Sequence, residues 1–265
     1  MLNVISKISG GFRVKKAKIV LIGINGFGKS IVRHLQKCEN IDLIGIHDIN
    51  TEALMEVSRL FNLTPIKTLD EVLQSDCDGV VLEVPNHVHL ALAKACAEAG
   101  KHVLVEKPIT NTVEEAEEMI RICRENNVIL QVGHSTRFCP RYRKAKELLD
   151  SNEIGKVVMI EANSSSEKGK SQTPESWRYY RDKCPGGPML QLGIHLIDTI
   201  FYLTGCVYRS VTGYFTEGFS DTDNVDAGAI VMKLENDALA YVGSSYVSPH
   251  THEMVIYGDR GKMEI

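Results

Sequence analysis

The chain has 265 residues, of which 43% are hydrophobic and 24% charged, and its formal net charge is −4. These values are ordinary for a globular protein and give no electrostatic reason to expect nucleic acid or an anionic membrane as a partner. No apolar run approaches the roughly 20 residues needed to span a bilayer.

The first half of the chain predicts alternating strands and helices. Residues 1–17 carry no continuous apolar segment, so we expect a frayed extension rather than a signal peptide. Two Thr-x-x-Glu capping boxes, at 68–71 and 112–115, start helices. Strands are predicted at 18–24, 42–47, 79–84, 102–105 and 128–132, with helices after Gly28, at 86–99 and from 112 to about 126. This alternation predicts a doubly wound parallel (Rossmann) sheet over residues 18–136.

The pattern changes after Arg137 and predicts a second, α+β domain over residues 137–265 with a mainly antiparallel sheet. The short Glu-Asn-Asp stretch at 235–237 predicts a hairpin between two of its strands. We expect a linking helix at 140–149, a strand at 156–162, a mobile loop at 163–173, a helix from about 189 to 203 that ends at Gly205, and strands at 207–215, 227–234, 238–247 and 252–257.

The sequence ends at Ile265 inside a strand-like run, so we expect the second sheet to be incomplete. An incomplete sheet leaves an edge and an apolar face that need cover. This predicts self-association through the second domain, as a homodimer or homotetramer.

Cysteine usage favours a reducing, cytoplasmic environment. The seven cysteines are scattered, without a Cys-x-x-Cys pair, and we expect no bound metal. Cys184 precedes a Pro-Gly-Gly turn, and it fits either an unreactive loop thiol or a thiol near a site.

A glycine-rich loop, Gly23-Ile-Asn-Gly-Phe-Gly28, lies between the first strand and the first helix. Small residues and a helix amino terminus are what a dinucleotide diphosphate needs, and we assign the contact to Gly23, Asn25, Gly26, Phe27 and Gly28. Asn25 takes the place of the usual middle glycine, and a purely structural turn is the alternative.

Asp48 follows the second strand, twenty residues after Gly28. A carboxylate there accepts ribose hydroxyl protons and repels a 2′-phosphate, which favours NAD over NADP as the cofactor. The alternative is a solvent-facing aspartate at a strand end.

The stretch Ala99–Pro108 is the most informative part of the chain. A helix is expected to end at Gly100, and the short strand that follows delivers Glu106, Lys107 and Pro108 at its carboxyl end. Ligands of open parallel sheets bind at this end of the strands. Taken alone, the tripeptide also fits an exposed lysine in an ordinary turn.

In this setting Glu-Lys-Pro resembles the glucose-fructose oxidoreductase, inositol dehydrogenase and rhizopine-catabolism (Gfo/Idh/MocA) family. Three further segments resemble the family in the same order: Asp78–His89, Val132–Pro140 and Gly186–Asp198. The resemblance implies an NAD-dependent oxidoreductase that oxidises a secondary hydroxyl of a sugar, nucleotide sugar or cyclitol, or reduces the corresponding ketone.

The resemblance also implies roles for individual residues. Lys107 would bind and polarise the reacting oxygen, and His195 would carry its proton. Gln191 stands where the family commonly has aspartate; its side chain could orient the imidazole but cannot stabilise an imidazolium by charge. Further substrate contacts are Arg137, Trp177, Arg178 and Asp198, and further cofactor contacts are Pro85, Asn86, His89, Glu106 and Lys107.

Several of these residues have structural alternatives. His195 also fits a satisfied core histidine, Asn86 a helix N-cap, and the pair Trp177 and Arg178 domain-interface packing. Two other functions remain open: a non-catalytic dinucleotide- or sugar-sensing regulator on the same fold, which Gln191 favours, and a redox-neutral lyase or glycosidase with permanently bound NAD. Retention of both Lys107 and His195 argues for the oxidoreductase.

Overall fold

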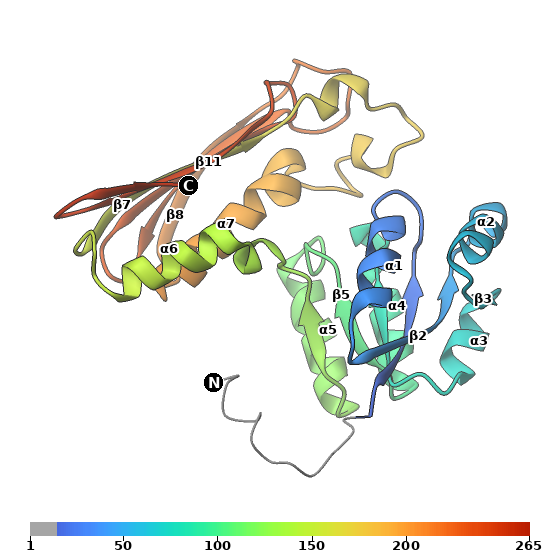
Figure 1. Cartoon of the computed structure of the whole chain (residues 1–265). Coiled ribbons are helices and arrows are strands. Elements are labelled where there is room, and N and C mark those ends of the chain that lie inside the picture. Colours follow the sequence, from blue (N-terminus) through green and yellow to red (C-terminus); the bar gives the residue numbers. More distant parts are fainter. Residues whose placement is uncertain (1–14) are drawn as a thin grey trace, which may run out of the picture. The chain divides into compact units, whose positions relative to one another are not determined.

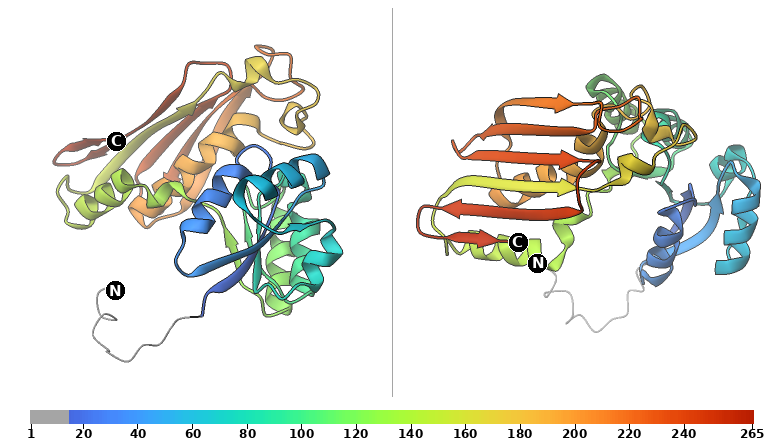
Figure 2. Two further views of the ribbon diagram at one scale, coloured as in Figure 1. Left: turned by 45° about the vertical axis from the view of Figure 1, so that its right-hand side comes forward. Right: turned by 90° about the horizontal axis from the view of Figure 1, so that it is seen from above.

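The computed structural model describes residues 15–265, which form two compact units (Figure 1, Figure 2). Unit 1 contains the described chain up to Val84 together with Ala91–Val105 and Glu118–Gln131, and unit 2 contains the other described residues. The expected extension at 1–17 lies almost entirely outside the described residues.

Unit 2 is discontinuous, whereas the sequence predicted one boundary between residues 136 and 137. It includes Pro85–Leu90 and Glu106–Glu117, which directly follow strands of the first sheet. These segments are tied to the later part of the chain by hydrogen bonds, from Asn86 Nδ2 to the main-chain oxygen of Lys183 (3.2 Å) and from Lys107 Nζ to that of Gln191 (3.1 Å). Such long-range bonds leave no local signal in the sequence.

The first sheet has the strand order β3-β2-β1-β4-β5-β6, the order of a doubly wound dinucleotide-binding sheet. Strand β1 pairs in parallel with β2 and β4, which confirms the predicted fold class. The elements of this half are β1 (Ala17–Ile22), α1 (Gly28–Lys37), β2 (Ile41–His47), α2 (Thr51–Phe61), β3 (Pro65–Ile66), α3 (Leu69–Gln74), β4 (Gly79–Leu82), α4 (His89–Glu98), β5 (His102–Val105), α5 (Val113–Glu125) and β6 (Leu130–Val132).

Local sequence accounts for most of these boundaries. All four residues of β4 are buried, as expected for a strand covered on both faces. The N–H of Glu71 donates to Thr68 Oγ1 and that of Glu115 to Thr112 Oγ1, both at 3.2 Å, so both predicted capping boxes are confirmed. The two-residue strand β3 was not predicted.

The second sheet has the order β12-β11-β7-β10-β9-β8 and belongs entirely to unit 2. It is mainly antiparallel, as predicted, although β7 and β10 pair in parallel. The predicted hairpin is confirmed, because β9 and β10 pair antiparallel. The elements are α6 (Pro140–Asp150), β7 (Val157–Ser165), α7 (Ile194–Thr204), β8 (Tyr208–Thr216), β9 (Ala227–Leu234), β10 (Leu239–Ser245), β11 (Thr251–Gly258) and β12 (Lys262–Glu264).

Helices α6 and α7 lie along one face of this sheet (Figure 1). Tyr142 of α6 and Leu196 of α7 are fully buried with Ile160 and Ala240 of the sheet, in the core of unit 2. The start of α7 is thereby held firmly against the strands, which fixes the helix that carries His195.

The mobile loop predicted at 163–173 starts too early, because residues 163–165 belong to a strand, and its mobility stays a prediction. Strand β7 continues to Ser165, and a 3₁₀ turn follows at Lys168–Ser171. Ser244 Oγ donates to the main-chain oxygen of Ser164 (2.7 Å), and the N–H of Ser245 donates to Ser165 Oγ (3.0 Å). These bonds to β10 satisfy polar groups of Ser164 and Ser165, the small polar residues that suggested a loop.

Strand β8 is exposed along its whole length at the edge of the second sheet. Val211, Tyr214 and Phe215 expose 52%, 85% and 50% of their surface. This apolar edge is consistent with the expected self-association, which stays a prediction. None of the helices within residues 15–265 is both long and apolar enough to cross a membrane.

Candidate active site

The loop between β1 and α1 carries the glycines that the sequence singled out. Gly23 has φ +89°, and a Cβ there would lie 2.1 Å from the main-chain oxygen of Glu83, so only glycine fits. A Cβ on Gly28 would lie 2.5 Å from the oxygen of Gly23. Gly26 has φ +58°, but no atom of the described residues lies within 4 Å of the position its Cβ would take. The loop is packed tightly at Gly23 and open at Gly26.

This geometry fits a bound diphosphate. The loop leads into the amino terminus of α1, whose first turn contains no acidic residue, and the N–H groups of such a helix end attract anions. The side chain of Phe27 is 60% exposed, and Asn25 Nδ2 reaches Asp48 Oδ2 at 3.4 Å. Unit 1 therefore has the cradle that a dinucleotide requires.

Asp48 also has a structural role, which its distance of twenty residues from Gly28 did not indicate. The side chain is buried, and its two oxygens accept the N–H groups of Ile24 (2.9 Å) and Asn50 (2.8 Å). The carboxylate thus ties the glycine loop to the end of β2. Each carboxylate oxygen has two lone pairs, so contact with a ribose hydroxyl remains open to it.

In unit 2, Lys107 lies in a turn to which the side chain of His89 is hydrogen-bonded. His89 is 1% exposed, and its Nδ1 lies 3.0 Å from the main-chain oxygen of Pro108, to which it donates. Lys107 Nζ donates to the main-chain oxygen of Gln191 at 3.1 Å. The structure thus shows His89 positioning the lysine turn, and its predicted contact with the cofactor stays a prediction.

Two other predicted cofactor residues border this turn. Burial raises the pKa of Glu106, whose carboxylate accepts the N–H of Lys107 at 3.2 Å. Pro85 precedes a 3₁₀ turn at Asn86–Val88, which leads directly into α4. Their contacts with the cofactor also stay predictions.

Gln191 does not orient His195, so that expectation is wrong. Its Nε2 donates to Asn86 Oδ1 and its Oε1 accepts from Arg178 Nε, both at 3.4 Å. The reason is a π-helical segment at Met189–Gly193, which precedes α7. Hydrogen bonds in a π-helix run to the fifth residue, so the turn is wider and side chains four apart no longer stack.

The partner of His195 is Thr136, which sequence reasoning missed. Thr136 Oγ1 lies 3.1 Å from His195 Nδ1. His134 and His252 also lie close enough for their charge to lower the pKa of His195. His134 and Thr136 lie in the segment Val132–Pro140, which resembles the family. Their position just after a parallel strand could have indicated that they belong to the site.

Burial is the largest cause of an unusually low pKa at His195. Together with the charges of Lys107, His134 and His252, it lowers the pKa of His195 to about 3. The imidazole is therefore neutral at neutral pH and able to accept a proton.

Stability should consequently fall in acid. The folded form binds fewer protons than the unfolded form between about pH 6.5 and pH 3, so the free energy of unfolding falls as the pH drops through this window, by at most about 1.4 kcal/mol per pH unit from His195. Urea unfolding at several pH values, followed through the fluorescence of Trp177, the chain's one tryptophan, measures this slope in unit 2.

A matched pair of variants tests whether the pH dependence of the free energy of unfolding comes from His195. His195→Gln should flatten it by about one proton, whereas His250→Gln, at an exposed position, should leave it nearly unchanged. An unchanged slope in His195→Gln would contradict the buried neutral imidazole.

Arg137 and Asp198 form an ion pair with each other. Arg137 Nε donates to Asp198 Oδ2 at 2.9 Å, and a second bond joins Nη2 to Oδ1. The Asp198 side chain is only 12% exposed. The pair holds the turn that carries Thr136 against α7, and its predicted contact with substrate stays a prediction.

Trp177 and Arg178 form a stack in unit 2. The Arg178 guanidinium lies 4.1 Å from the Trp177 ring centroid, and the ring of His87 lies 6.1 Å away on the same tryptophan. Burial raises the pKa of Cys184 to about 11, so this thiol stays protonated at neutral pH and fits the unreactive alternative.

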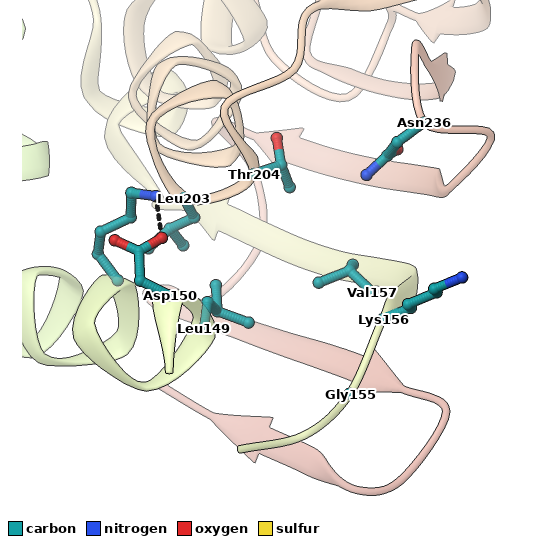
Figure 3. A pocket seen from close by; sticks show the side chains of 9 residues that line it. Leu149, Asp150, Gly155, Lys156, Val157, Leu203, Thr204 and Asn236 are labelled. Carbon is teal, nitrogen blue, oxygen red and sulfur yellow. Dashed lines mark hydrogen bonds and ion pairs between the residues drawn. The ribbon is translucent and has the colours of Figure 1, made fainter. Parts of the chain in front are cut away.

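Two hollows in unit 2 lie away from these residues. One of about 260 Å³ opens beside the carboxyl ends of α6 and α7, where Asp150 forms an ion pair with Lys146 (Figure 3). It contains none of the predicted site residues. The candidate site is therefore described by its polar cluster.

Two family models match the chain, and together they cover nearly all of it. Residues 17–134 match the oxidoreductase family with an NAD-binding Rossmann fold, and residues 142–264 match the GFO/IDH/MocA C-terminal domain. The chain belongs to the Gfo/Idh/MocA family. It is thus an oxidoreductase of an NAD-binding family, as the sequence predicted.

Individual members of the Gfo/Idh/MocA family resemble the chain over most of its length. The myo-inositol 2-dehydrogenase of Thermotoga maritima is 26% identical over 91% of this chain and 74% of its own. The 2,7-anhydro-N-acetylneuraminate hydratase of Mediterraneibacter gnavus is 28% identical over 95% of this chain and 68% of its own. The crystal structure of a Desulfitobacterium hafniense oxidoreductase, described as NADPH-dependent, superimposes with a TM-score of 0.89 at 28% identity, covering 94% of this chain and 73% of that one.

Proposed function

We propose that the protein is an NAD-dependent oxidoreductase that transfers a hydride between the nicotinamide and a secondary alcohol or ketone of a sugar, nucleotide sugar or cyclitol. The observation that supports this best is the arrangement around the start of α7. Lys107 reaches the main-chain oxygen of Gln191, and it lies close enough to His195 for its charge to lower the pKa of the imidazole. A cation and a neutral base thus converge on one place in unit 2.

The residues would divide the reaction between them. In the oxidative direction the O–H proton of the substrate passes to His195 Nε2, the C–H hydrogen leaves as hydride, and the C=O bond forms. Lys107 stabilises the negative charge that grows on the oxygen. NAD, when bound by the glycine loop of unit 1, supplies the acceptor for the hydride.

Thr136 would hold His195 in the tautomer that this step needs. If Nδ1 carries the hydrogen and donates to Thr136 Oγ1, the lone pair of Nε2 is available to the substrate. This hydroxyl takes over the orienting role that the sequence had assigned to Gln191. It offers no negative charge, so the protonated imidazole remains a strong acid.

A substrate screen tests the proposal. Purified protein with NAD is incubated with a panel of sugars, sugar acids, sugar phosphates and cyclitols, and NADH absorbance is followed. Steady formation of NADH with at least one compound supports the oxidoreductase. Tight NAD binding without turnover of any compound would support the regulator instead.

We propose NAD as the preferred cofactor because Asp48 stands at the end of β2. Its neighbour Ile49 is 95% exposed, and no arginine or lysine follows at Asn50. Ile49→Arg supplies a cation for a 2′-phosphate and should tighten NADP binding about 10-fold, with a smaller change for NAD. Calorimetry with both cofactors measures this, and Leu60→Arg, at an exposed position of α2, is the control.

The outcome in the unmutated protein is equally specific. NAD should bind at least about 10-fold tighter than NADP, since a carboxylate repels the extra phosphate. Equal affinities would contradict the role given to Asp48.

A redox-neutral reaction is the second candidate. It is favoured by the similarity to the hydratase of Mediterraneibacter gnavus, over 95% of this chain. In that case substrate would be converted without net NADH formation. Product analysis by NMR, alongside the absorbance measurement, distinguishes the two reactions.

A further inference from the structure

Arg178 is a cation with neutral partners. Its Nε donates to Gln191 Oε1 at 3.4 Å, and its guanidinium stacks on Trp177 at 4.1 Å. Within residues 15–265 it forms no ion pair, and neither of its Nη atoms has a hydrogen-bond partner there. Arg137 is paired with Asp198 and Arg181 with Glu217, whereas Arg141 resembles Arg178 in lying over a ring, that of Tyr142, without an ion pair among the described residues.

Positive charges act on several buried groups near Arg178, although the carboxylate of Asp182 acts on His87, whose ring lies 6.1 Å from that of Trp177. The buried thiol of Cys184 is influenced by Arg178 and Lys107, and the buried hydroxyl of Tyr246 by Arg178. The charges that act on His195 are those of Lys107, His134 and His252. Gln191, whose side chain touches Arg178, is an amide at the position where an acid would have neutralised it.

We propose that the substrate of this site is an anionic sugar, whose carboxylate or phosphate group is bound by Arg178. This inference rests on the proposed function and deepens it by naming the substrate class. A guanidinium that keeps its two Nη groups available presents a planar fork, which matches two oxygens of either group. Stacking on Trp177 fixes the plane of that fork before the ligand arrives.

An anionic substrate would also explain how His195 can act as a general base despite its low pKa. At a pKa of about 3, His195 holds a proton weakly, whereas a general base works best with a pKa near the working pH. A bound anion would offset the charge of the nearby cations and raise the pKa of His195. A neutral sugar has no such effect, so the site favours its anionic substrate in catalysis as well as in binding.

The diphosphate of the cofactor is the other source of an anion. The open glycine loop and the amino terminus of α1 in unit 1 already provide a cradle for it. Calorimetric titration of NAD, without any sugar, therefore forms a separate arm of the test.

The experiment compares matched ligands that differ only in charge. Binding and turnover are measured for glucose, glucuronate and glucose 6-phosphate, and for the corresponding galactose series, in the presence of NAD. At least one anionic compound should bind about 10- to 100-fold tighter than its neutral counterpart. The carboxylate and phosphate arms show which oxyanion the site takes.

Three variants assign the selectivity to Arg178, and a fourth serves as the control. Arg178→Gln should remove the advantage of the anionic compound, and Arg178→Lys should restore only part of it because the fork is lost. Gln191→Glu places a carboxylate of nearly unchanged shape against Arg178 Nε, and it should reduce the advantage as Arg178→Gln does. Arg181→Gln removes a nearby arginine that is paired with Glu217, and it should leave the selectivity unchanged.

Several outcomes would overturn the inference. Neutral and anionic compounds could bind equally, Arg178→Gln could weaken both to the same extent, or it could weaken NAD and not the sugar. Failure of the proposed function looks different: anionic sugars would bind with the expected dependence on Arg178, but no NADH would form.

Discussion

Replacing Lys107 with methionine or His195 with glutamine is expected to lower turnover by about 10³-fold or more, while NAD still binds. General acid–base catalysis contributes roughly 10²- to 10⁴-fold, and removal of a group that stabilises a developing oxyanion costs about 10²- to 10³-fold. Neither residue belongs to the glycine loop of unit 1, so NAD should still bind to both variants. Calorimetry should find the NAD affinity of His195→Gln within a few-fold of the parent, whereas Lys107→Met, which alters a predicted cofactor contact, should cost more.

Both single variants should resemble the double variant, because residues that act on the same proton and oxygen are not additive. Lys168→Met and His250→Gln change the same residue types at exposed positions of unit 2 and serve as controls. Full turnover of the screened substrate in both Lys107→Met and His195→Gln would show that the chemistry lies elsewhere.

The glycine loop yields the second large effect, on folding. Gly23→Ala would force a Cβ to within 2.1 Å of the main-chain oxygen of Glu83, at φ +89°. Overpacking and a positive φ together should destabilise unit 1 by on the order of 3 kcal/mol or more. Loss of helical signal at lower urea, measured by circular dichroism, would show this.

Gly26 and Gly100 supply the comparison. Both have positive φ, and neither has an atom of the described residues within 4 Å of its missing Cβ, so alanine at either position should cost only about 1–2 kcal/mol. Gly26→Ala should also weaken NAD binding about 10-fold or more, since its methyl group would occupy the open side of the loop, whereas Gly100→Ala should not. Equal NAD affinity in these two variants would contradict the assignment of the loop.

Features that depend on near neighbours in the chain could be predicted from the sequence. The capping boxes at Thr68 and Thr112 formed as expected, and Gly205 ends α7 with φ +68°. The alternation of apolar strands and helices determined the parallel sheet, and the carboxyl end of β5 delivered Lys107. In each case a residue and its partner lie within a few positions or follow a simple period.

Partners far apart in the chain were decided only by the tertiary structure. The sequence predicted Ser164 and Ser165 in a loop, but both form hydrogen bonds with residues of β10. The side chain of Gln191 was expected to bond to His195 and instead bonds to Arg178 and Asn86. The π-helical segment at Met189–Gly193 is the physical cause of that second change. Spacing along the sequence assumes a regular helix, and a single wider turn moves every side chain before it to another face.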